Sequence, residues 1–94
     1  MNHTLSHKGE MPALKRIEGQ IRGIQKMIEE ERYCVDILTQ ISSVAGALTR
    51  VQDKILGEHL NACVSNTLKD SSKAERQIKI DEVITLIKKF RKNI

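Results

Sequence analysis

A long stripe of aliphatic side chains in the middle of the sequence constrains the fold of this chain more than any other feature. The stripe repeats at steps of four and three residues, as in the seam of a coiled coil, and no proline interrupts it. Its members are Ile37, Ile41, Val44, Leu48, Val51 and Ile55. This spacing predicts a helix over about 33–67, and a helix of that length needs a packing partner along much of its apolar side.

Shorter apolar stripes on either side predict two more helices. Between Leu14 and Ile28, leucine or isoleucine recurs every three or four residues, and Pro12 suits the first turn of a helix. We therefore expect the first helix over about 11–29. Ser72 and Glu75 form a capping-box pattern ahead of a further apolar stripe, which predicts a third helix over about 73–92. The expected fold class is all-α, with three helices per chain.

The composition agrees with a small helical bundle. The chain has 94 residues, of which 39% are hydrophobic and only 2% aromatic, so we expect a core of aliphatic side chains. Residues 1–10 should form a flexible N-terminal tail and residues 11–94 a single helical domain. The apolar runs are too short for a membrane span, and no signal-peptide segment is visible, so we expect a cytoplasmic protein without a membrane partner.

Cys34, His59 and Cys63 continue the long stripe beyond both of its ends. Around an ideal helix, His59 and Cys63 lie about 20° to either side of Cys34, so the three side chains share one face. Along the helix, however, Cys34 lies roughly 38 Å from His59, which is too far for a shared metal ion. Two copies of the helix packed antiparallel about a two-fold axis would place Cys34 of one chain beside His59 and Cys63 of the other. The small residues 45–47 (Ala-Gly-Ala) would lie where the helices cross.

The donor set indicates the class of metal. Two thiolates and an imidazole suit Cu(I) or Zn(II), and suit magnesium or calcium poorly. Three donors match trigonal Cu(I), whereas Zn(II) usually takes a fourth ligand. His3 or His7 would supply that ligand for Zn(II), Ni(II) or Co(II). The structural alternatives are a cysteine that packs as a small apolar side chain and a histidine that is hydrogen-bonded within the core.

Basic side chains on the first two predicted helices form a candidate DNA-binding face. Several of them fall within about 40° around the first helix. The net charge of +4 is compatible with a polyanionic partner, because attraction to phosphates supplies much of the affinity of proteins for DNA. For each residue the alternative is an ordinary solvated surface charge. The candidates are Lys15, Arg16, Arg22, Lys26, Arg50 and Lys54.

Three stretches of the sequence resemble the CsoR/RcnR/FrmR family of metal-sensing transcriptional repressors. They are residues 14–24 (LKRIEGQIRGI), residues 33–38 (YCVDIL), and Glu58-His59-Leu60 with Cys63. The Cys, His, Cys pattern is the ligand set of the copper-sensing subtype. The resemblance implies a helical homotetramer built from two antiparallel homodimers, without a helix-turn-helix. It also implies that the metal-free form binds operator double-stranded DNA, and that Cu(I) binding releases it and derepresses copper efflux or detoxification genes.

The resemblance also assigns roles to individual residues. Cys34 of one protomer would bind the ion together with His59 and Cys63 of its partner. Tyr33 and Glu82 match positions that hydrogen-bond the metal-bound histidine and couple the site to the assembly, with Asp81 as an alternative to Glu82. Nickel- and cobalt-sensing members add an N-terminal histidine, and His3 lies near that place.

Other kinds of function remain as alternatives. A thiol or persulfide redox switch would join Cys34 of one chain to Cys63 of another, and a metal chaperone would hold copper without binding DNA. Family members that sense formaldehyde lack the second cysteine, and those that sense persulfides lack the histidine. No nucleophile–base pair, phosphate-binding loop or metal site with a catalytic acid is visible, so we expect no enzymatic activity.

Overall fold

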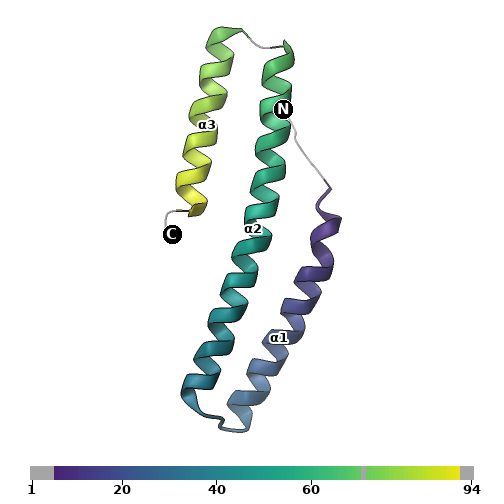
Figure 1. Ribbon diagram of the computed structural model, residues 1–94, viewed down its shortest axis with the longest axis vertical. Helices are drawn as coiled ribbons and strands as arrows, with labels where there is room; N and C mark the ends of the chain where they lie inside the picture. The colour runs from purple at the N-terminus through teal and green to yellow at the C-terminus, as the bar shows by residue number, and fades with distance from the viewer. Residues whose placement is uncertain (1–5, 71, 92–94) are drawn as a thin grey trace. The chain divides into compact units, whose positions relative to one another are not determined.

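The computed structural model describes residues 6–70 and 72–91, with side chains for 6–62 and 72–91. After a short 3-10 turn, η1 (Lys8–Glu10), come three helices: α1 (Met11–Glu29), α2 (Cys34–Asp70) and α3 (Lys73–Arg91) (Figure 1). The described part of the chain contains no strand, which confirms the all-α prediction. The first helix has the predicted bounds, and the second runs three residues beyond the predicted end. Residue 92, the predicted end of the third helix, lies outside the described residues.

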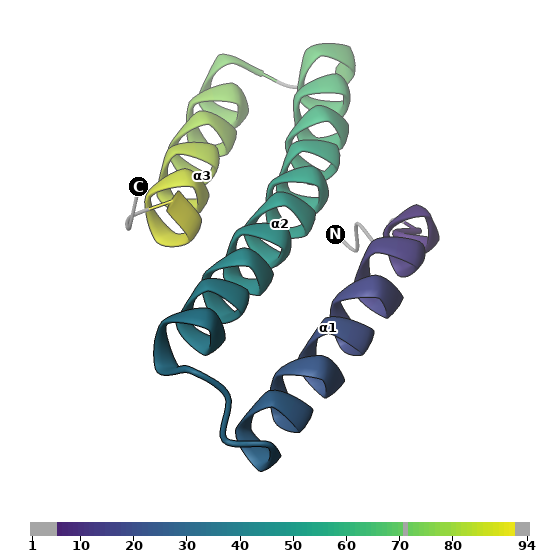
Figure 2. The ribbon, with the colours of Figure 1, turned by 60° about the horizontal axis from the view of Figure 1, so that its bottom comes forward.

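The chain divides into two compact units within α2. One unit contains η1, α1 and α2 up to Leu56, and the other contains α2 from Gly57 together with α3. In the first unit, α1 and the N-terminal part of α2 run side by side in opposite directions, as Figures 1 and 2 show. In the second unit, the C-terminal part of α2 and α3 do the same. The single-domain organisation stays a prediction.

The last three residues of the predicted N-terminal tail, residues 1–10, adopt a short turn ahead of α1. Residues Lys8–Glu10 form a 3-10 turn, in which the Glu10 N–H donates to the His7 carbonyl at 2.9 Å. Glu10 is 9% exposed, and the turn leads directly into α1, where Pro12 occupies the first turn as expected. His3, in the same predicted tail, lies outside the described residues.

The connection from α1 to α2 is a tight turn closed by backbone hydrogen bonds. Glu31 has a φ of 53°, the left-handed conformation usually taken by glycine at the end of a helix. Its N–H donates to the Ile28 carbonyl at 3.1 Å, and the Arg32 N–H donates to the Met27 carbonyl at 2.9 Å. Together these bonds form a Schellman motif. The motif reverses the chain direction, and α2 begins soon afterwards at Cys34.

Only part of the apolar stripe of α2 is buried within the chain. Val44 and Val51, each 7% exposed, pack with Ile17 of α1 in the buried core of the first unit. Ala13, Ile24, Ala47 and Ile55 surround this core. Ile41 and Leu48 belong to the same stripe but remain 46% and 44% exposed. Contacts within the chain therefore cover only about half of the predicted apolar seam.

Large apolar side chains are also exposed on all three helices. They are Met11, Leu14, Ile21 and Ile28 on α1, Val35, Leu38, Ile41 and Leu48 on α2, and Ile78, Ile80, Ile84, Ile87 and Phe90 on α3. Exposed apolar surface on this scale is typical of a chain that associates with another. No helix within the described residues is long and apolar enough to cross a membrane.

The N-cap half of the predicted capping box is present at the start of α3, where Ser72 caps the helix. The Glu75 N–H donates to the Ser72 Oγ at 3.3 Å, and the Ser72 hydroxyl donates to the Glu75 carboxylate at 3.3 Å. The Arg76 N–H donates to the Ser72 carbonyl at 3.0 Å. The bond to the Ser72 Oγ satisfies the Glu75 N–H, which would otherwise lack a partner in the first turn, and this favours a helix start at Lys73.

Candidate metal centre and nucleic-acid interface

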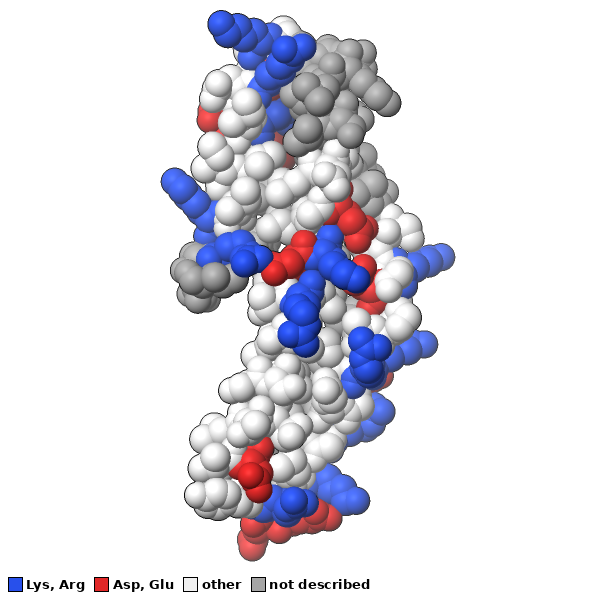
Figure 3. All heavy atoms as spheres, viewed as in Figure 1, with Lys and Arg blue, Asp and Glu red and all other residues white. Residues whose placement is uncertain are grey.

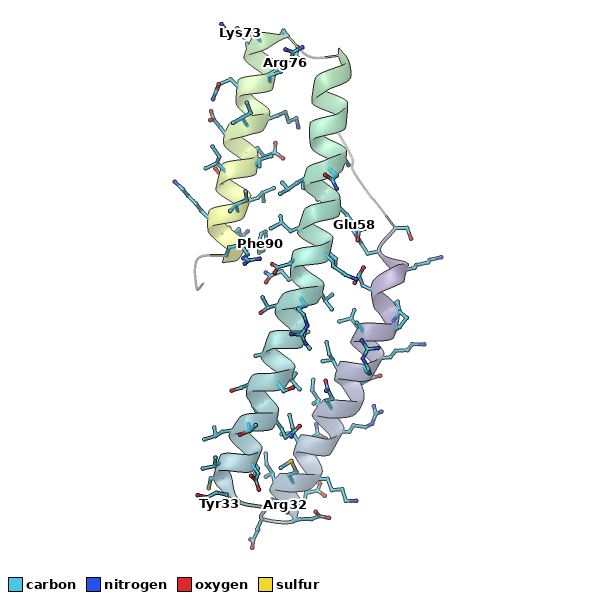
Figure 4. The ribbon with its side chains drawn as sticks, viewed as in Figure 1. Arg32, Tyr33, Glu58, Lys73, Arg76 and Phe90 are labelled. Atoms are coloured by element: carbon cyan, nitrogen blue, oxygen red, sulfur yellow. The ribbon has the colours of Figure 1, made fainter. Side chains whose placement is uncertain are left out.

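Cys34 is the first residue of α2, immediately after the Schellman turn. The carbonyl of the preceding residue, Tyr33, accepts the N–H groups of Asp36 at 3.0 Å and Ile37 at 3.2 Å, so the backbone at this position opens the helix. The Cys34 thiol is exposed and not in a disulfide. Tyr33 is 68% exposed and lies with Arg32 in the turn between the helices (Figure 4). Both side chains are accessible to a second molecule.

His59 lies further along the same helix and is partly buried. Cys63 also belongs to α2, but its side chain lies outside the described residues. Among the described side chains of one chain, no three from His, Cys, Asp and Glu come close enough to hold an ion. Cys34 and His59 thus share a helix without forming a site within one molecule.

The two candidate carboxylates on α3 are both exposed and both engaged by neighbours on their own helix. The Lys79 ammonium donates to the Glu82 carboxylate at 3.5 Å. The Gln77 side-chain amide donates to the Asp81 carboxylate at 3.1 Å. The choice between Glu82 and Asp81 as a partner of the metal-bound histidine therefore stays open.

The predicted DNA-binding residues all carry exposed side chains on α1 or α2. Lys and Arg side chains follow the outer edge of α1 in the space-filling view (Figure 3). Arg22 pairs with Glu18 at 3.9 Å, and both side chains are well exposed, so this ion pair contributes little to stability. Lys15, Arg22 and Lys26 therefore stand on an open helix surface.

A cleft of about 240 Å³ brings three of the other predicted cations together. Arg16 of α1 and Arg50 and Lys54 of α2 line it, over apolar side chains that belong to the core of the first unit. Its remaining polar lining comes from Glu10, Gln20 and Ser43. These three residues were missed by the sequence analysis, because an isolated glutamate, glutamine or serine carries no signal until the helices are paired.

Among the described residues, none packs closely enough against Gly46 to require a glycine there. A Cβ built there would meet only the guanidinium of Arg50, at 3.7 Å, which is ordinary van der Waals contact. A glycine inside a helix is destabilising by about 1 kcal/mol relative to alanine. The sequence analysis predicted that two α2 helices cross closely at Gly46. That crossing, which needs a second chain, remains a prediction and would account for the glycine.

Residues 6–89 match the protein family described as metal-sensitive transcriptional repressor. The chain belongs to this family of repressors. The predicted resemblance to metal-sensing repressors is confirmed, and since the family consists of transcriptional repressors, the prediction that the chain is not an enzyme is confirmed as well.

Among curated relatives of this metal-sensitive repressor is the copper-sensing transcriptional repressor CsoR of Bacillus subtilis. It is 43% identical over 96 residues, covering 96% of this chain and 92% of the relative. The copper-sensing repressor RicR of Mycobacterium tuberculosis is 54% identical over 55 residues, covering 58% of this chain and 57% of the relative.

Two solved structures resemble this repressor throughout most of its length. The copper-sensing repressor CsoR with Cu(I) from Geobacillus thermodenitrificans has a TM-score of 0.74 and 39% identity, covering 97% of this chain and 94% of that one. The nickel-responsive transcriptional regulator InrS has a TM-score of 0.73 and 32% identity, covering 90% and 96%. The three-helix fold of the chain is therefore shared by sensors of different metals.

Proposed function

We propose that this repressor senses Cu(I) through a site formed by two protomers, with Cys34 from one and His59 and Cys63 from the other. The observation that carries the proposal is the likeness to the Cu(I)-containing CsoR structure, at 39% identity over 97% of this chain. The relatives at 43% and 54% identity are also copper-sensing repressors. Two thiolates and one imidazole fit Cu(I), a soft ion that accepts three ligands. Donor chemistry alone therefore favours the same metal as the likeness to copper-sensing repressors.

The need for a second protomer follows from the placement of the donors. Cys34 opens α2 with an exposed thiol, and His59 lies in the same helix. Because an α-helix rises about 1.5 Å per residue, the two side chains share an ion only when a second copy brings its own α2 alongside. The exposed Ile41 and Leu48 supply apolar contacts for such a pair. The proposed assembly is an antiparallel homodimer that associates further into a homotetramer.

The proposed partner is operator double-stranded DNA, which the metal-free protein binds in the cytoplasm. The exposed cations of α1 and α2 would contact phosphates, since these contacts provide most of the affinity without reading sequence. Binding of a metal ion supplies new bonds between the α2 helices of two protomers. Arg50 and Lys54 stand on the same helix as the three donors, so a shift of α2 displaces them from the phosphates.

The coupling between the two ligands is thermodynamic. If Cu(I) lowers the affinity of the repressor for DNA, then DNA lowers its affinity for Cu(I) by the same factor. A change from mostly bound to mostly free operator needs a difference of about 5 kcal/mol between the two states. The outcome in the cell is derepression of copper efflux or detoxification genes.

A Ni(II), Co(II) or Zn(II) sensor is the second candidate, favoured by the likeness to the nickel-responsive InrS. In that case His3, which lies outside the described residues, would provide a fourth ligand. A thiol redox switch between Cys34 and Cys63 of two protomers is the remaining alternative.

The deciding experiment titrates metal into the metal-free protein bound to its own promoter DNA, followed by fluorescence anisotropy. Release at one Cu(I) per chain, with no release by Ni(II) or Zn(II), is the expected result. Release by Ni(II) and loss of that response in His3→Ala would identify the second candidate. Under reducing conditions, continued DNA binding at saturating Cu(I) would refute copper sensing. A response to oxidant that survives His59→Ala would identify the redox switch.

A further inference from the structure

The cleft between α1 and α2 is partly open to solvent and is lined by several charged side chains. Four charged side chains line its volume of about 240 Å³: Arg16, Arg50, Lys54 and Glu10. All four belong to the same compact unit, so their grouping is a property of one helical pair. A water molecule occupies about 30 Å³ in the liquid, which leaves room in the cleft for the five heavy atoms of a phosphate group.

The cations of the cleft are not neutralised by ion pairs. Among the described residues, the carboxylates of Glu18, Glu30 and Glu82 pair with cations elsewhere, and Arg16, Arg50 and Lys54 join no ion pair within 4.0 Å. The three exposed cations therefore remain available to an anion that enters from solvent.

Glu10 is the only acidic residue in the lining, and its environment differs from that of the cations. It is 9% exposed and is the one polar or charged residue buried in the described part of the chain. A buried carboxylate is unfavourable unless nearby charges or hydrogen bonds compensate for the lost water. The 2.9 Å bond from its N–H to the His7 carbonyl holds Glu10 in the 3-10 turn before α1, where it lines the same cleft as the three cations without pairing with any of them.

We propose that this cleft is a phosphate-binding site, and that the Glu10 carboxylate in its lining lowers the affinity of the site for anions. The proposal rests on the proposed function, in which the protein binds DNA. A phosphodiester of the operator and a free phosphate ion present the same chemistry to Arg16, Arg50 and Lys54. In either case Glu10 repels the incoming anion and holds the affinity below the level that the cations alone would give.

The test compares metal-free, full-length Glu10→Gln and wild-type protein for binding to the promoter DNA over a range of salt concentrations. Glu10→Gln should bind roughly 5-fold or more tightly at low salt, because a like charge has left the site. The plot of log K against log salt should become steeper by about 1 for each cleft that gains a phosphate contact. The affinity for Cu(I) without DNA should not change.

Glu29→Gln is the matched control, because it removes the same charge from the exposed surface of α1 and Glu29 pairs with none of the proposed DNA contacts. Equal effects of Glu10→Gln and Glu29→Gln would attribute the change to net charge and overturn the proposal. Unchanged or weaker DNA binding by a folded Glu10→Gln protein would also overturn it. Wild-type binding and Cu(I) release are measured in parallel, so that failure of the cleft proposal remains distinct from failure of the proposed function.

A second pair of variants tests the cleft without removing Glu10. Ser43 lines the cleft, whereas its neighbour Ser42 does not. Ser43→Asp should weaken DNA binding at least roughly 5-fold more than Ser42→Asp, because it adds a second carboxylate to the site. Equal weakening by the two variants would count against the cleft.

The source of the phosphate is identified by NMR titration of the protein with inorganic phosphate against sodium chloride at equal ionic strength. Saturable shifts of the Gln20 and Ser43 amides would show that the cleft accepts free phosphate, as the proposal allows. If these shifts are absent but the salt dependence of DNA binding changes as expected, the ligand is the DNA phosphodiester. The absence of both effects overturns the proposal.

Discussion

The backbone N–H of Arg32 donates to the carbonyl of Met27 at 2.9 Å and closes the end of α1 around Glu31, whose φ is 53°. This arrangement sets the direction in which the chain enters α2. Because Cys34 is the first residue of α2, the geometry of the turn also positions the thiol proposed to bind metal. Four of the proposed DNA contacts lie on α1, and the turn thus links the end of this helix to Cys34, a proposed metal ligand.

Glu31→Gly should stabilise the protein by about 0.5–1 kcal/mol, because glycine adopts the left-handed conformation without the steric penalty of a side chain. Chemical denaturation monitored by circular dichroism at fixed protein concentration measures the difference. Glu30→Gly is the control, since Glu30 has an ordinary φ of −86° and its replacement should be destabilising. Equal destabilisation by both variants would contradict the role assigned to Glu31.

Leu48→Lys should shift the protein towards the monomer in sedimentation velocity experiments. Leu48 is 44% exposed in the single chain and belongs to the half of the apolar stripe that α1 does not cover. A charge placed in an apolar interface has to be desolvated on association, which weakens binding of the second copy. Thr39→Lys adds the same charge at an exposed position about 180° around α2 from Leu48 and should leave assembly unchanged. Equal sedimentation of both variants and wild type would exclude Leu48 from the interface.

Cys34→Ser and His59→Ala should each bind the promoter DNA like wild type but fail to release it when Cu(I) is added. Removing one of three donors weakens the proposed site without touching the basic residues. Anisotropy titrations with Cu(I) buffered by a competing chelator measure the response. Thr39→Ala, a change at an exposed position of the first part of α2, is the control and should respond normally. Normal release by either donor variant would remove that residue from the site.

Glu82→Gln and Asp81→Asn distinguish the two candidate partners of the metal-bound histidine. The variant that removes the true partner of the histidine should still bind Cu(I), but Cu(I) should then lower its DNA affinity less. The reason is that losing a hydrogen bond to the imidazole ring weakens the coupling between the two sites more than it weakens metal coordination. Measuring Cu(I) affinity with and without DNA gives the coupling directly. We expect the loss for Glu82→Gln. A loss confined to Asp81→Asn would assign the role to Asp81, and wild-type coupling in both would exclude both carboxylates from the response.

The sequence alone predicted the helices well because their signals are local. Apolar spacing and Pro12 predicted the first helix, and the Glu75 N–H donates to the Ser72 Oγ as the capping-box pattern predicted. The family was also recognisable from short motifs. The turn at Glu31 was harder, since no glycine marks the left-handed residue and only the closing hydrogen bonds reveal it.

The sequence by itself determined which residues are helical, which side chains are apolar, and that Cys34, His59 and Cys63 lie in one helical phase. Only the tertiary structure decided that Val44 and Val51 turn to α1 while Leu48 remains exposed, and that Arg16, Arg50 and Lys54 share a cleft with Glu10. The reason is physical: helical periodicity is set by neighbours a few residues apart. Which part of an apolar stripe becomes buried, and which charges meet, depends on the packing of two helices against each other.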